Sequence, residues 1–428
     1  LPPVFENLYK RMPDAIEGAV EFINVDKLAY RICTEAGERP SMDPNAVREA
    51  SKDAFRQVVV PGTPLGDDGT SRSYLEAEVR SVIKGRGLES IEEYLGIHRT
   101  GRGTRFDGSR RRQAWEYMEA WNARMAASRI GDFPDTISLA VELAKARTKP
   151  TYRSAVIDEA QDLSLMGLQL VRALVNAPDD VDRSDGLLIV GDGAQRIYPG
   201  AFTLRQAGVE VRGRTTVLRR NYRNTAEILN AAMAVAGRGS VVDMDDEADA
   251  EPHRRDEEVG DAGRFGPRPL LVDCGTDDRE TEFLVERIRG IVASGMMGLG
   301  GIGIFVPINS MVRSTLKRLG EHDIAATGLK DYHGVPTPEV KVGTYARAKG
   351  LEFKVVFLPR VKAGVVPRAQ TARQSDDEYA DQRELAINEF FVAMTRARDQ
   401  LIVSFGDEPS EVLVGVMGDF DVVAPEDL

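Results

Sequence analysis

Two adjacent acidic residues follow a short apolar run in the stretch AVIDEAQDLS, residues 155–164. The run AVI is typical of a buried strand, so Asp158 and Glu159 would leave the end of that strand side by side. One carboxylate of such a pair can hold Mg²⁺ while the other orients an attacking water, which is the chemistry of phosphoryl transfer. An acidic turn that caps the next helix explains the same residues equally well.

Two stretches downstream carry polar groups that suit a phosphate. LLIVGDGAQRIY ends a second apolar run and supplies Gln195, an amide that can position water or sense a terminal phosphate. In VLRRNYRNTAEILN, Arg223 precedes a helix predicted to begin at Asn224 or Thr225. A cation is unfavourable at a helix N-terminus, which favours an anionic partner for Arg223. An ordinary surface ion pair is the alternative.

Two further stretches lie near the end of the chain. In TYARAKGLEF, Gly350 permits a tight turn and Glu352 follows it. In FVAMTRARDQLIV, Arg396 and Arg398 close a predicted helix ahead of a strand. Cations are favourable at a helix C-terminus, so a purely structural role also explains these two arginines.

The elements that must position these residues are short apolar strands alternating with amphipathic helices. This pattern predicts an α/β fold with parallel sheets, in which ligands bind at the carboxyl ends of the strands. We predict a first lobe from residues 1–45 and 134–215 and a second lobe from residues 216–428. Residues 46–133 lack clear buried strands and predict a mainly helical insert in the first lobe.

The net charge of −12 is concentrated in two acidic segments. Residues 243–261 carry ten acidic and two basic residues, and residues 376–384 carry five acidic and one basic residue. We predict surface loops at 243–261 and 368–384. Because the rest of the chain is balanced, the overall acidity does not exclude a nucleic-acid partner.

Other compositional features narrow the class of protein. Cys33 and Cys274 are too few for a disulfide framework and fit a reducing, cytoplasmic location. The four histidines show no spacing typical of zinc ligands. No apolar run approaches the roughly 20 residues that a membrane helix needs, so we expect no membrane contact.

Taken together and in order, five of these stretches resemble the motifs of UvrD/Rep-like superfamily 1 helicases. DEAQD is similar to motif II, VGDGAQRIY to motif III, LRRNYRNT to motif IV, ARAKGLEF to motif V and FVAMTRARDQL to motif VI. FINVDKLAYRI, residues 22–32, is similar to the segment that carries motif Ib. The resemblance covers most of the chain outside residues 46–133 and the acidic segments.

The resemblance implies two RecA-like lobes with ATP between them and movement along single-stranded DNA without sequence preference. It implies that Asp158 binds Mg²⁺ and that Glu159 activates the hydrolytic water. Gln195 would report the γ-phosphate to the DNA-binding surface. Arg223 and Arg396 would stabilise charge on the transferring phosphoryl group from the second lobe.

The same resemblance assigns the rest of the ATP and DNA contacts. Tyr222 would stack near the adenine and Glu352 would meet the ribose, with Gly350 shaping the turn between them. Thr344 would lie on the DNA side, and Tyr198 is a candidate for stacking on a base.

Two other groups are candidates for DNA contact. Phe202 follows Tyr198 at a place where the family often has another aromatic residue. Arg110, Arg111 and Arg112 belong to a basic segment of the predicted insert, and they would either bind DNA phosphates or form a solvated charged surface.

The sequence departs from the family pattern in its phosphate-binding loop. The motif G-x-x-x-x-G-K-[ST] is absent, and the chain contains no Gly-Lys, Lys-Ser or Lys-Thr pair. We expect the N-terminal part of the first lobe to be missing and this chain alone to hydrolyse ATP poorly. The alternative is a catalytically dead, helicase-like module that binds nucleic acid or protein.

A second departure concerns length. Larger family members insert a whole domain between motifs IV and V, whereas only 115 residues separate Thr225 from Lys341 in this sequence. We predict that this accessory domain is absent or vestigial.

Overall fold

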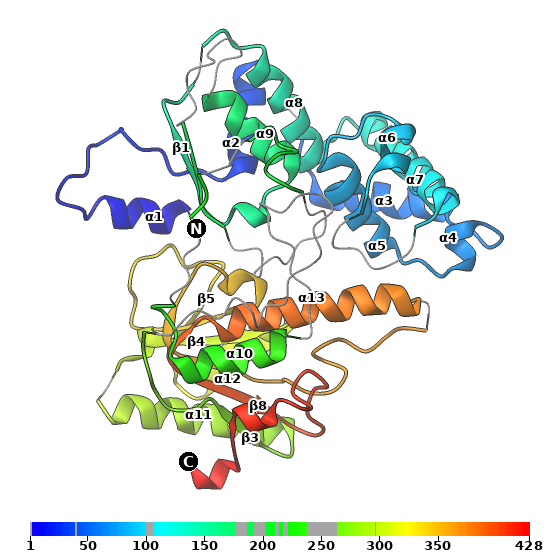
Figure 1. Cartoon of the computed structure of the whole chain (residues 1–428). Helices are drawn as coiled ribbons and strands as arrows, with labels where there is room; N and C mark the ends of the chain where they lie inside the picture. Colours follow the sequence, from blue (N-terminus) through cyan, green and yellow to red (C-terminus); the bar gives the residue numbers. More distant parts are fainter. Residues whose placement is uncertain are drawn as a thin grey trace.

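The computed structural model describes residues 2–38, 41–99, 106–149, 151–175, 186–191, 202–209, 214–216, 221–237, 263–295, 297–372 and 374–428. Gln195, Tyr198 and the acidic segment 243–261 lie outside these residues. Figure 1 shows two α/β lobes, the first at the top and the second at the bottom, with a helical insert beside the first. No helix among the described residues is both long and apolar enough to cross a membrane.

A two-stranded parallel sheet and the helices packed around it form the described part of the first lobe. The strands pair with Ala155 opposite Leu187. Both strands coincide with apolar runs predicted from the sequence. The first run directly precedes DEAQD, and the second directly precedes VGDGAQRIY. The elements of this part are α1 (Pro2–Tyr9), α2 (Val25–Glu35), α8 (Phe133–Lys145), β1 (Ala155–Ile157), η2 (Ala160–Asp162), α9 (Leu165–Val175) and β2 (Leu187–Ile189).

The insert is built from helices around a core of its own. Trp121, Tyr117 and Tyr94 are fully buried in that core. An all-helical core explains why this part of the sequence shows no strand pattern. Its elements are α3 (Pro44–Val58), α4 (Pro64–Asp67), α5 (Arg72–Ala77), the π-helical segment η1 (Glu78–Lys84), α6 (Ile91–Gly96) and α7 (Gly108–Ala127).

A buried cation joins the insert to the first lobe. Lys84, at the end of η1, lies 3.0 Å from Asp132 and 2.7 Å from Asp135. Asp132 also accepts a hydrogen bond from the Asp135 backbone N–H and so caps α8. Lys84 and Asp132 expose 6% and 4% of their side chains, so this contact is shielded from solvent.

A seven-stranded, wholly parallel sheet forms the second lobe, in the order β5-β6-β4-β7-β8-β3-β9. Predicted strands in this half of the chain therefore lie in one sheet. The strands are β3 (Leu270–Asp273), β4 (Ile302–Val306), β5 (Ala326–Gly328), β6 (Val340–Thr344), β7 (Phe353–Leu358), β8 (Ala397–Phe405) and β9 (Asp421–Val423).

Helices cover both faces of this sheet. The apolar cluster on one face includes Ile228 and Phe390, and the cluster on the other includes Ile288 and Leu319. The helices are α10 (Ala226–Ala236) and α13 (Asp376–Met394) on the first face, and α11 (Asp277–Ala293) and α12 (Asn309–Glu321) on the second. Short 3₁₀ turns are η5 (Leu299–Gly301), η6 (Ala346–Ala348), η7 (Met417–Asp419) and η8 (Pro425–Asp427).

The prediction of a surface loop over residues 368–384 is wrong for its second half. Residues from Asp376 onward belong to α13. Ser375 caps this helix by accepting a hydrogen bond from the Glu378 backbone N–H, and the acidic residues of the first turn complement the helix dipole. A run of acidic residues therefore starts a helix here.

The interval between motifs IV and V holds no separate domain among its described residues. It contains α10, the units β3–α11 and β4–α12, and β5. Residues 329–339 alone connect β5 to β6. The described part agrees with the predicted absence of the accessory domain.

Candidate functional site between the two lobes

Asp158 and Glu159 leave the carboxyl end of β1. The Ala160 N–H donates to the Val190 carbonyl (3.0 Å), so the exit of β2 is held against the exit of β1. Glu159 has the left-handed backbone angles φ 53° and ψ 45°, which are uncommon for a residue with a Cβ atom. Such conformations persist where the surroundings enforce them, and they cluster at functional sites.

The Glu159 carboxylate is held by a neighbour within the same motif. The Gln161 side chain, 2% exposed, donates from Nε2 to Glu159 Oε2 at 2.6 Å. Gln161 Oε1 then faces Gly191, where a Cβ atom would lie 2.9 Å away. Gly191, in the VGDG turn, thus leaves the space that Gln161 needs to orient Glu159.

A lysine of the second lobe reaches these acids. Lys349, which follows η6, lies 2.7 Å from Asp162 and 3.5 Å from Glu159. Its side chain is only 6% exposed. The carboxyl end of β1 in the first lobe therefore faces the segment between β6 and β7 in the second lobe.

The ionisation of Asp158 depends on both lobes. Burial and the neighbouring Glu159 carboxylate raise the pKa of Asp158, while the Glu159 backbone N–H and the cations of Arg223 and Lys349 act to lower it. Arg223 and Lys349 are hence close enough to influence the charge of Asp158. A carboxylate crowded by another carboxylate gains from a divalent cation, which fits Mg²⁺ at Asp158.

A magnesium ion at this place would need oxygen ligands beyond the protein. Among the described residues no group of three or more His, Cys, Asp or Glu side chains is arranged to hold a metal ion. Mg²⁺ is commonly bound by one or two carboxylates together with phosphate and water oxygens. Asp158 is partly desolvated by its neighbours but still reaches solvent, which suits that shared mode of binding.

Arg223 and Glu352 meet at the surface of the second lobe. Arg223 Nε lies 3.4 Å from Glu352 Oε2, and both side chains are about half exposed. Tyr222, next to Arg223, is 71% exposed. Thr225 accepts a hydrogen bond from the Ile228 N–H and caps α10, which confirms the predicted helix start. The structure thus gathers these residues of motifs IV and V.

Arg396 is fully buried at the end of α13. Its guanidinium donates to the Val392 carbonyl (2.8 Å), the Leu351 carbonyl (3.5 Å) and Thr395 Oγ1 (3.0 Å). Bonds from an arginine to the last carbonyls of a helix are structurally favourable, as the sequence indicates. Leu351 adjoins Glu352, so Arg396 lies against motif V.

Asp158 and Glu159 follow the expectation that ligands bind at the carboxyl ends of strands, whereas two predicted nucleotide contacts of the second lobe do not. Glu352 and Arg396 directly precede β7 and β8, at the amino ends of these strands. The reason is that the site is shared between two sheets. Residues 345–352 run from the carboxyl end of β6 back to the amino end of β7, where Lys349 meets the first lobe.

Gly350 lies in this connecting segment, and Thr344 directly precedes it. Gly350 has φ 76°, a conformation that strains any residue with a side chain. Thr344 ends β6, and its Oγ1 accepts a hydrogen bond from the Arg347 N–H (3.3 Å). Thr344 is thus at the opposite end of the parallel sheet from Glu352.

The structure contradicts the prediction that Phe202 stacks on DNA bases. Its side chain is 4% exposed and packs with Ile157, Leu168 and Leu204 in the first lobe. An aromatic ring in an apolar core cannot present a face to a nucleotide. The sequence shows only that an aromatic residue stands at position 202. It does not show whether that residue stacks on a base or packs in the core.

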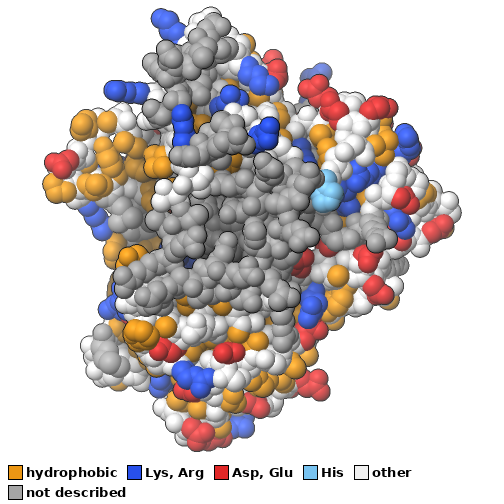
Figure 2. Space-filling view, viewed as in Figure 1, with side chains coloured by type: hydrophobic (Ala, Val, Ile, Leu, Met, Phe, Trp, Pro, Cys, Tyr) orange, Lys and Arg blue, Asp and Glu red, His pale blue; other side chains and the backbone are white. Residues whose placement is uncertain are grey.

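Two of the three predicted DNA-binding arginines have structural partners within the insert. Arg110 pairs with Asp68 at 2.8 Å, and Arg111 donates to four backbone carbonyl groups near the start of α7. Arg112 is exposed to solvent. On the face drawn in Figure 2, basic side chains gather on the first lobe, whereas acidic and basic side chains alternate over the second.

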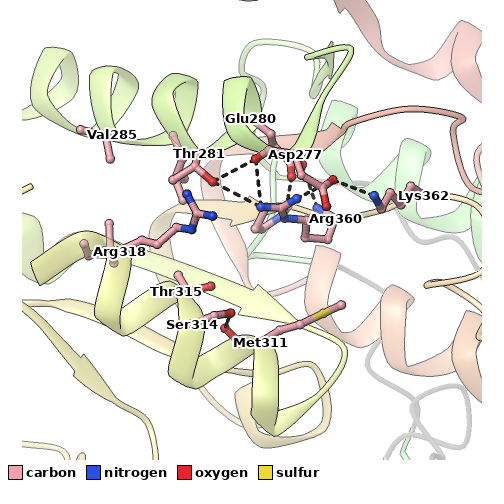
Figure 3. Close-up of a pocket in the computed structure, with 13 residues that line it drawn as sticks. Asp277, Glu280, Thr281, Val285, Met311, Ser314, Thr315, Arg318, Arg360 and Lys362 are labelled. Atoms are coloured by element: carbon pink, nitrogen blue, oxygen red, sulfur yellow. Dashed lines mark hydrogen bonds and ion pairs between the residues drawn. The ribbon is translucent and has the colours of Figure 1, made fainter. Parts of the chain in front are cut away.

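A cavity of about 260 Å³ lies in the second lobe between α11 and α12 (Figure 3). None of the predicted site residues lines it. Arg360 contacts Asp277 and Glu280, and Lys362 lies 2.7 Å from Asp277. Arg318 of α12 also lines the cavity and pairs with Asp278 at 3.2 Å, so these ion pairs tie both the loop after β7 and α12 to α11.

Three site residues escaped the sequence analysis. Lys349 lies inside the quoted stretch ARAKGLEF, and Gln161 and Asp162 lie inside DEAQD. Two signals in the sequence could have indicated the ion pair of Lys349 with Asp162. Lys349 stands beside the turn at Gly350, and Asp162 is a third acid in DEAQD to which no catalytic role was assigned. The pairing itself joins residues 187 positions apart, which no local pattern reveals.

Two family models match this chain. The UvrD/REP helicase N-terminal domain matches residues 29–208, and the UvrD-like helicase C-terminal domain matches residues 316–408. Together these matches cover more than half of the chain and include Asp158, Glu159, Lys349, Glu352 and Arg396, whereas Tyr222 and Arg223 lie between the two matched ranges.

Similar proteins include the ATP-dependent DNA helicase UvrD1 of Mycobacterium leprae, 28% identical over 215 residues, which are 45% of this chain and 25% of that protein. UvrD1 of Mycobacterium tuberculosis H37Rv is 29% identical over 280 residues, 61% of this chain and 33% of that protein. The chain spans a quarter to a third of the length of these relatives.

Among solved structures, the C-terminal domain of a possible DNA helicase from Lactobacillus plantarum is 15% identical, with a TM-score of 0.33, over 47% of this chain and 98% of that one. The family matches rest on sequence, and the two parallel-sheet lobes agree with them. The chain belongs to the UvrD/Rep-like superfamily 1 helicases.

Proposed function

We propose that this chain is the motor region of an ATP-dependent DNA helicase or translocase, which couples hydrolysis of Mg-ATP between its lobes to movement along single-stranded DNA. The observation that carries the proposal is the contact of Lys349 with Asp162 and Glu159 across the lobes. Acids from one lobe and cations from the other suit a transition state that spreads negative charge. Hydrolysis then depends on lobe closure, which couples it to movement.

The acids of the first lobe would act on the metal and the water. Asp158 would hold Mg²⁺, whose charge neutralises the phosphate oxygens when it is bound. Glu159 would accept a proton from the attacking water, with Gln161 fixing the orientation of its carboxylate. Gln195 would respond to the terminal phosphate.

The second lobe would supply cations and nucleotide contacts. Arg223 and Arg396 would stabilise charge on the transferring phosphoryl group, an effect worth ~10³–10⁵ in rate in related nucleotide hydrolases. For Arg396 this requires its guanidinium to leave the helix carbonyl that it now binds. Tyr222 would stack on the adenine, and Glu352 would meet the ribose beyond the turn at Gly350.

Single-stranded DNA would contact a different surface. Thr344 at the carboxyl end of β6 and Tyr198 are the proposed contacts, with Arg112 as a phosphate contact on the insert. Stacking of bases on aromatic side chains is tolerant of sequence and contributes about 1–3 kcal/mol per base. Phosphate contacts of this kind weaken as salt rises.

One feature favours a second candidate, a helicase-like module that binds nucleic acid or protein without turnover. The 428 residues contain no Gly-Lys pair and therefore no G-x-x-x-x-G-K-[ST] loop to cradle the phosphates. In the motor proposal, sequence outside this chain supplies that loop. We accordingly expect the chain alone to hydrolyse ATP poorly.

Steady-state ATP hydrolysis by the full-length protein, with and without single-stranded DNA of mixed sequence, separates the two candidates. The motor proposal expects DNA-stimulated hydrolysis by the full-length protein and little by these residues alone. RNA of the same sequence distinguishes the nucleic-acid class. DNA binding without hydrolysis by the full-length protein would support the binding module instead.

A further inference from the structure

One side chain of motif IV binds the carbonyl groups of the two residues that flank Arg396. Asn224 Nδ2 donates to the Thr395 carbonyl at 2.9 Å and to the Ala397 carbonyl at 2.6 Å. Asn224 is 2% exposed, so these bonds are shielded from water. Because the amide nitrogen of Asn224 donates both of its hydrogens to these two carbonyl groups, the side chain fixes the backbone that carries Arg396.

The orientation of the Asn224 amide is set by Asn221. Asn221 Nδ2 donates to Asn224 Oδ1 at 3.1 Å, which leaves both Asn224 donors for motif VI. Asn221 Oδ1 in turn accepts hydrogen bonds from the backbone N–H groups of Arg223 (2.9 Å) and Asn224 (3.0 Å). The backbone of Arg223 therefore belongs to the same hydrogen-bonded unit as that of Arg396.

A second side chain, outside all five motifs, makes the same connection. Arg264 Nη1 donates to the carbonyls of Arg223 (2.7 Å) and Arg398 (3.3 Å). Its Nη2 pairs with Asp399, and its own carbonyl accepts the Ala226 N–H at 2.8 Å. Arg264 thus spans the start of α10 and the start of β8, where it bonds to the carbonyl of Arg223 and to that of Arg398, two residues beyond Arg396.

We propose that Asn224 and Arg264 form a brace that sets the position of Arg223 relative to Arg396. Both are positioning residues, because each binds backbone beside an arginine and neither is expected to touch nucleotide. The inference rests on the proposed function and deepens it. Two cations that stabilise one phosphoryl group must arrive together, and a misplacement of about 1 Å can cost roughly 10²-fold in rate.

Arg264→Gln in the full-length protein tests the brace, with Arg268→Gln as the matched control. Arg268 lies on the same segment, pairs with Asp421 at 3.5 Å and also donates to the backbone carbonyl of Gly418, but these partners belong to neither motif IV nor motif VI. Both arginine side chains are partly exposed, 37% and 47%, so both variants should fold.

The expected result is a fall in kcat of about tenfold or more for Arg264→Gln, with KM for Mg-ATP changed less than about threefold. Affinity for ADP with aluminium fluoride, which mimics the transferring phosphoryl group, should fall in parallel while affinity for ADP alone is kept. Arg268→Gln should match the wild type in all of these, and thermal unfolding should shift similarly for both variants.

Asn224→Asp provides a second test, because it keeps the size of the side chain but removes both donors to motif VI. It should reproduce the pattern of Arg264→Gln, including the selective loss of affinity for the aluminium fluoride complex. Wild-type kcat and wild-type affinity for that complex in Arg264→Gln would overturn the brace while leaving the proposed function intact. Absence of hydrolysis in the wild-type full-length protein would refute both.

Discussion

Lys349 of the second lobe lies 2.7 Å from Asp162 of the first lobe, with the lysine side chain 6% exposed. The same ammonium group lies 3.5 Å from Glu159. An ion pair largely removed from water is screened little by salt, so it resists separation of the lobes more than a surface pair does. This contact therefore ties the state of the acid pair to the position of the second lobe.

Replacing Lys349 with Met should loosen the lobes. Asp162 and Glu159 are partly exposed, so the loss in free energy of unfolding should be about 1–2 kcal/mol, below the cost for a fully buried pair. The distance between dyes attached to the two lobes, measured by energy transfer, should increase. Lys354→Met, at an exposed position on β7, is the control. An unchanged distance in Lys349→Met would show that the ion pair does not hold the lobes.

Gly191→Ala should impair hydrolysis through Glu159. The added methyl group would lie 2.9 Å from Gln161 Oε1 and displace the side chain that donates to Glu159. We expect kcat of the full-length protein to fall about tenfold with affinity for ATP kept, because the water is no longer well oriented.

The control for this change is Gly290→Ala on α11, where a Cβ atom meets nothing within 4 Å. That variant should gain up to about 1 kcal/mol in stability, since alanine favours helix over glycine, and its kcat should stay normal. Equal kcat values for the two variants would argue against the orienting role of Gln161.

Lys84→Met should destabilise the junction between the insert and the first lobe. It leaves Asp132, 4% exposed, without its cation, at a cost of about 3 kcal/mol. Burial and Asp132 already raise the pKa of Asp135 to about 6, and loss of Lys84 would raise that pKa further. In Lys84→Met, the Asp135 carboxylate can then take up a proton at pH 5. The free energy of unfolding that this variant loses should therefore be smaller at pH 5 than at pH 7.

Chemical denaturation at the two pH values measures this effect. Lys145→Met is a suitable comparison, because Lys145 pairs with Glu142 on the exposed surface of α8 and should contribute less than about 1 kcal/mol. A loss for Lys84→Met as small as that for Lys145→Met would mean that the junction does not depend on this cation.

Glu389 on α13 should make stability depend on pH. Burial raises its pKa to about 7, against the opposing effect of Arg368. The folded state then binds more protons than the unfolded state between about pH 4.5 and pH 7. In that window this group lowers the free energy of unfolding as pH rises, by no more than about 1.4 kcal/mol per pH unit.

Glu389→Gln should remove that slope and stabilise the protein above pH 7, whereas Glu282→Gln, at an exposed position of α11, should keep it. Unfolding curves between pH 5 and pH 8 provide the measurement. A slope in Glu389→Gln equal to that of the wild type would assign the pH dependence to other groups.

Local patterns predict the elements of the second lobe well. The apolar runs that become β4 and β7 are buried along nearly their whole length, and amphipathic periodicity marks α11. The helix start at Thr225 also follows from local capping chemistry. These features depend on residues that are neighbours in sequence, so they can be predicted from the sequence alone.

Features that depend on packing between distant segments were not predictable. The helix start at Asp376 is a different case, because Ser375 and the acidic first turn are local signals that the sequence analysis interpreted as a loop. Phe202 is a core residue because the first lobe closes around it. The contact of Lys349 with Asp162, and the use of the amino ends of β7 and β8, follow from how two lobes face each other.

The most direct test of the account is ATP hydrolysis by the full-length protein carrying Glu159→Gln, in the presence of single-stranded DNA. Glutamine keeps the size and the contact with Gln161 but cannot accept a proton from water. We predict a loss of roughly 10²–10⁴-fold in DNA-stimulated kcat with ATP binding retained. Hydrolysis at the wild-type rate in Glu159→Gln would contradict the assignment of this acid pair as the centre of the motor.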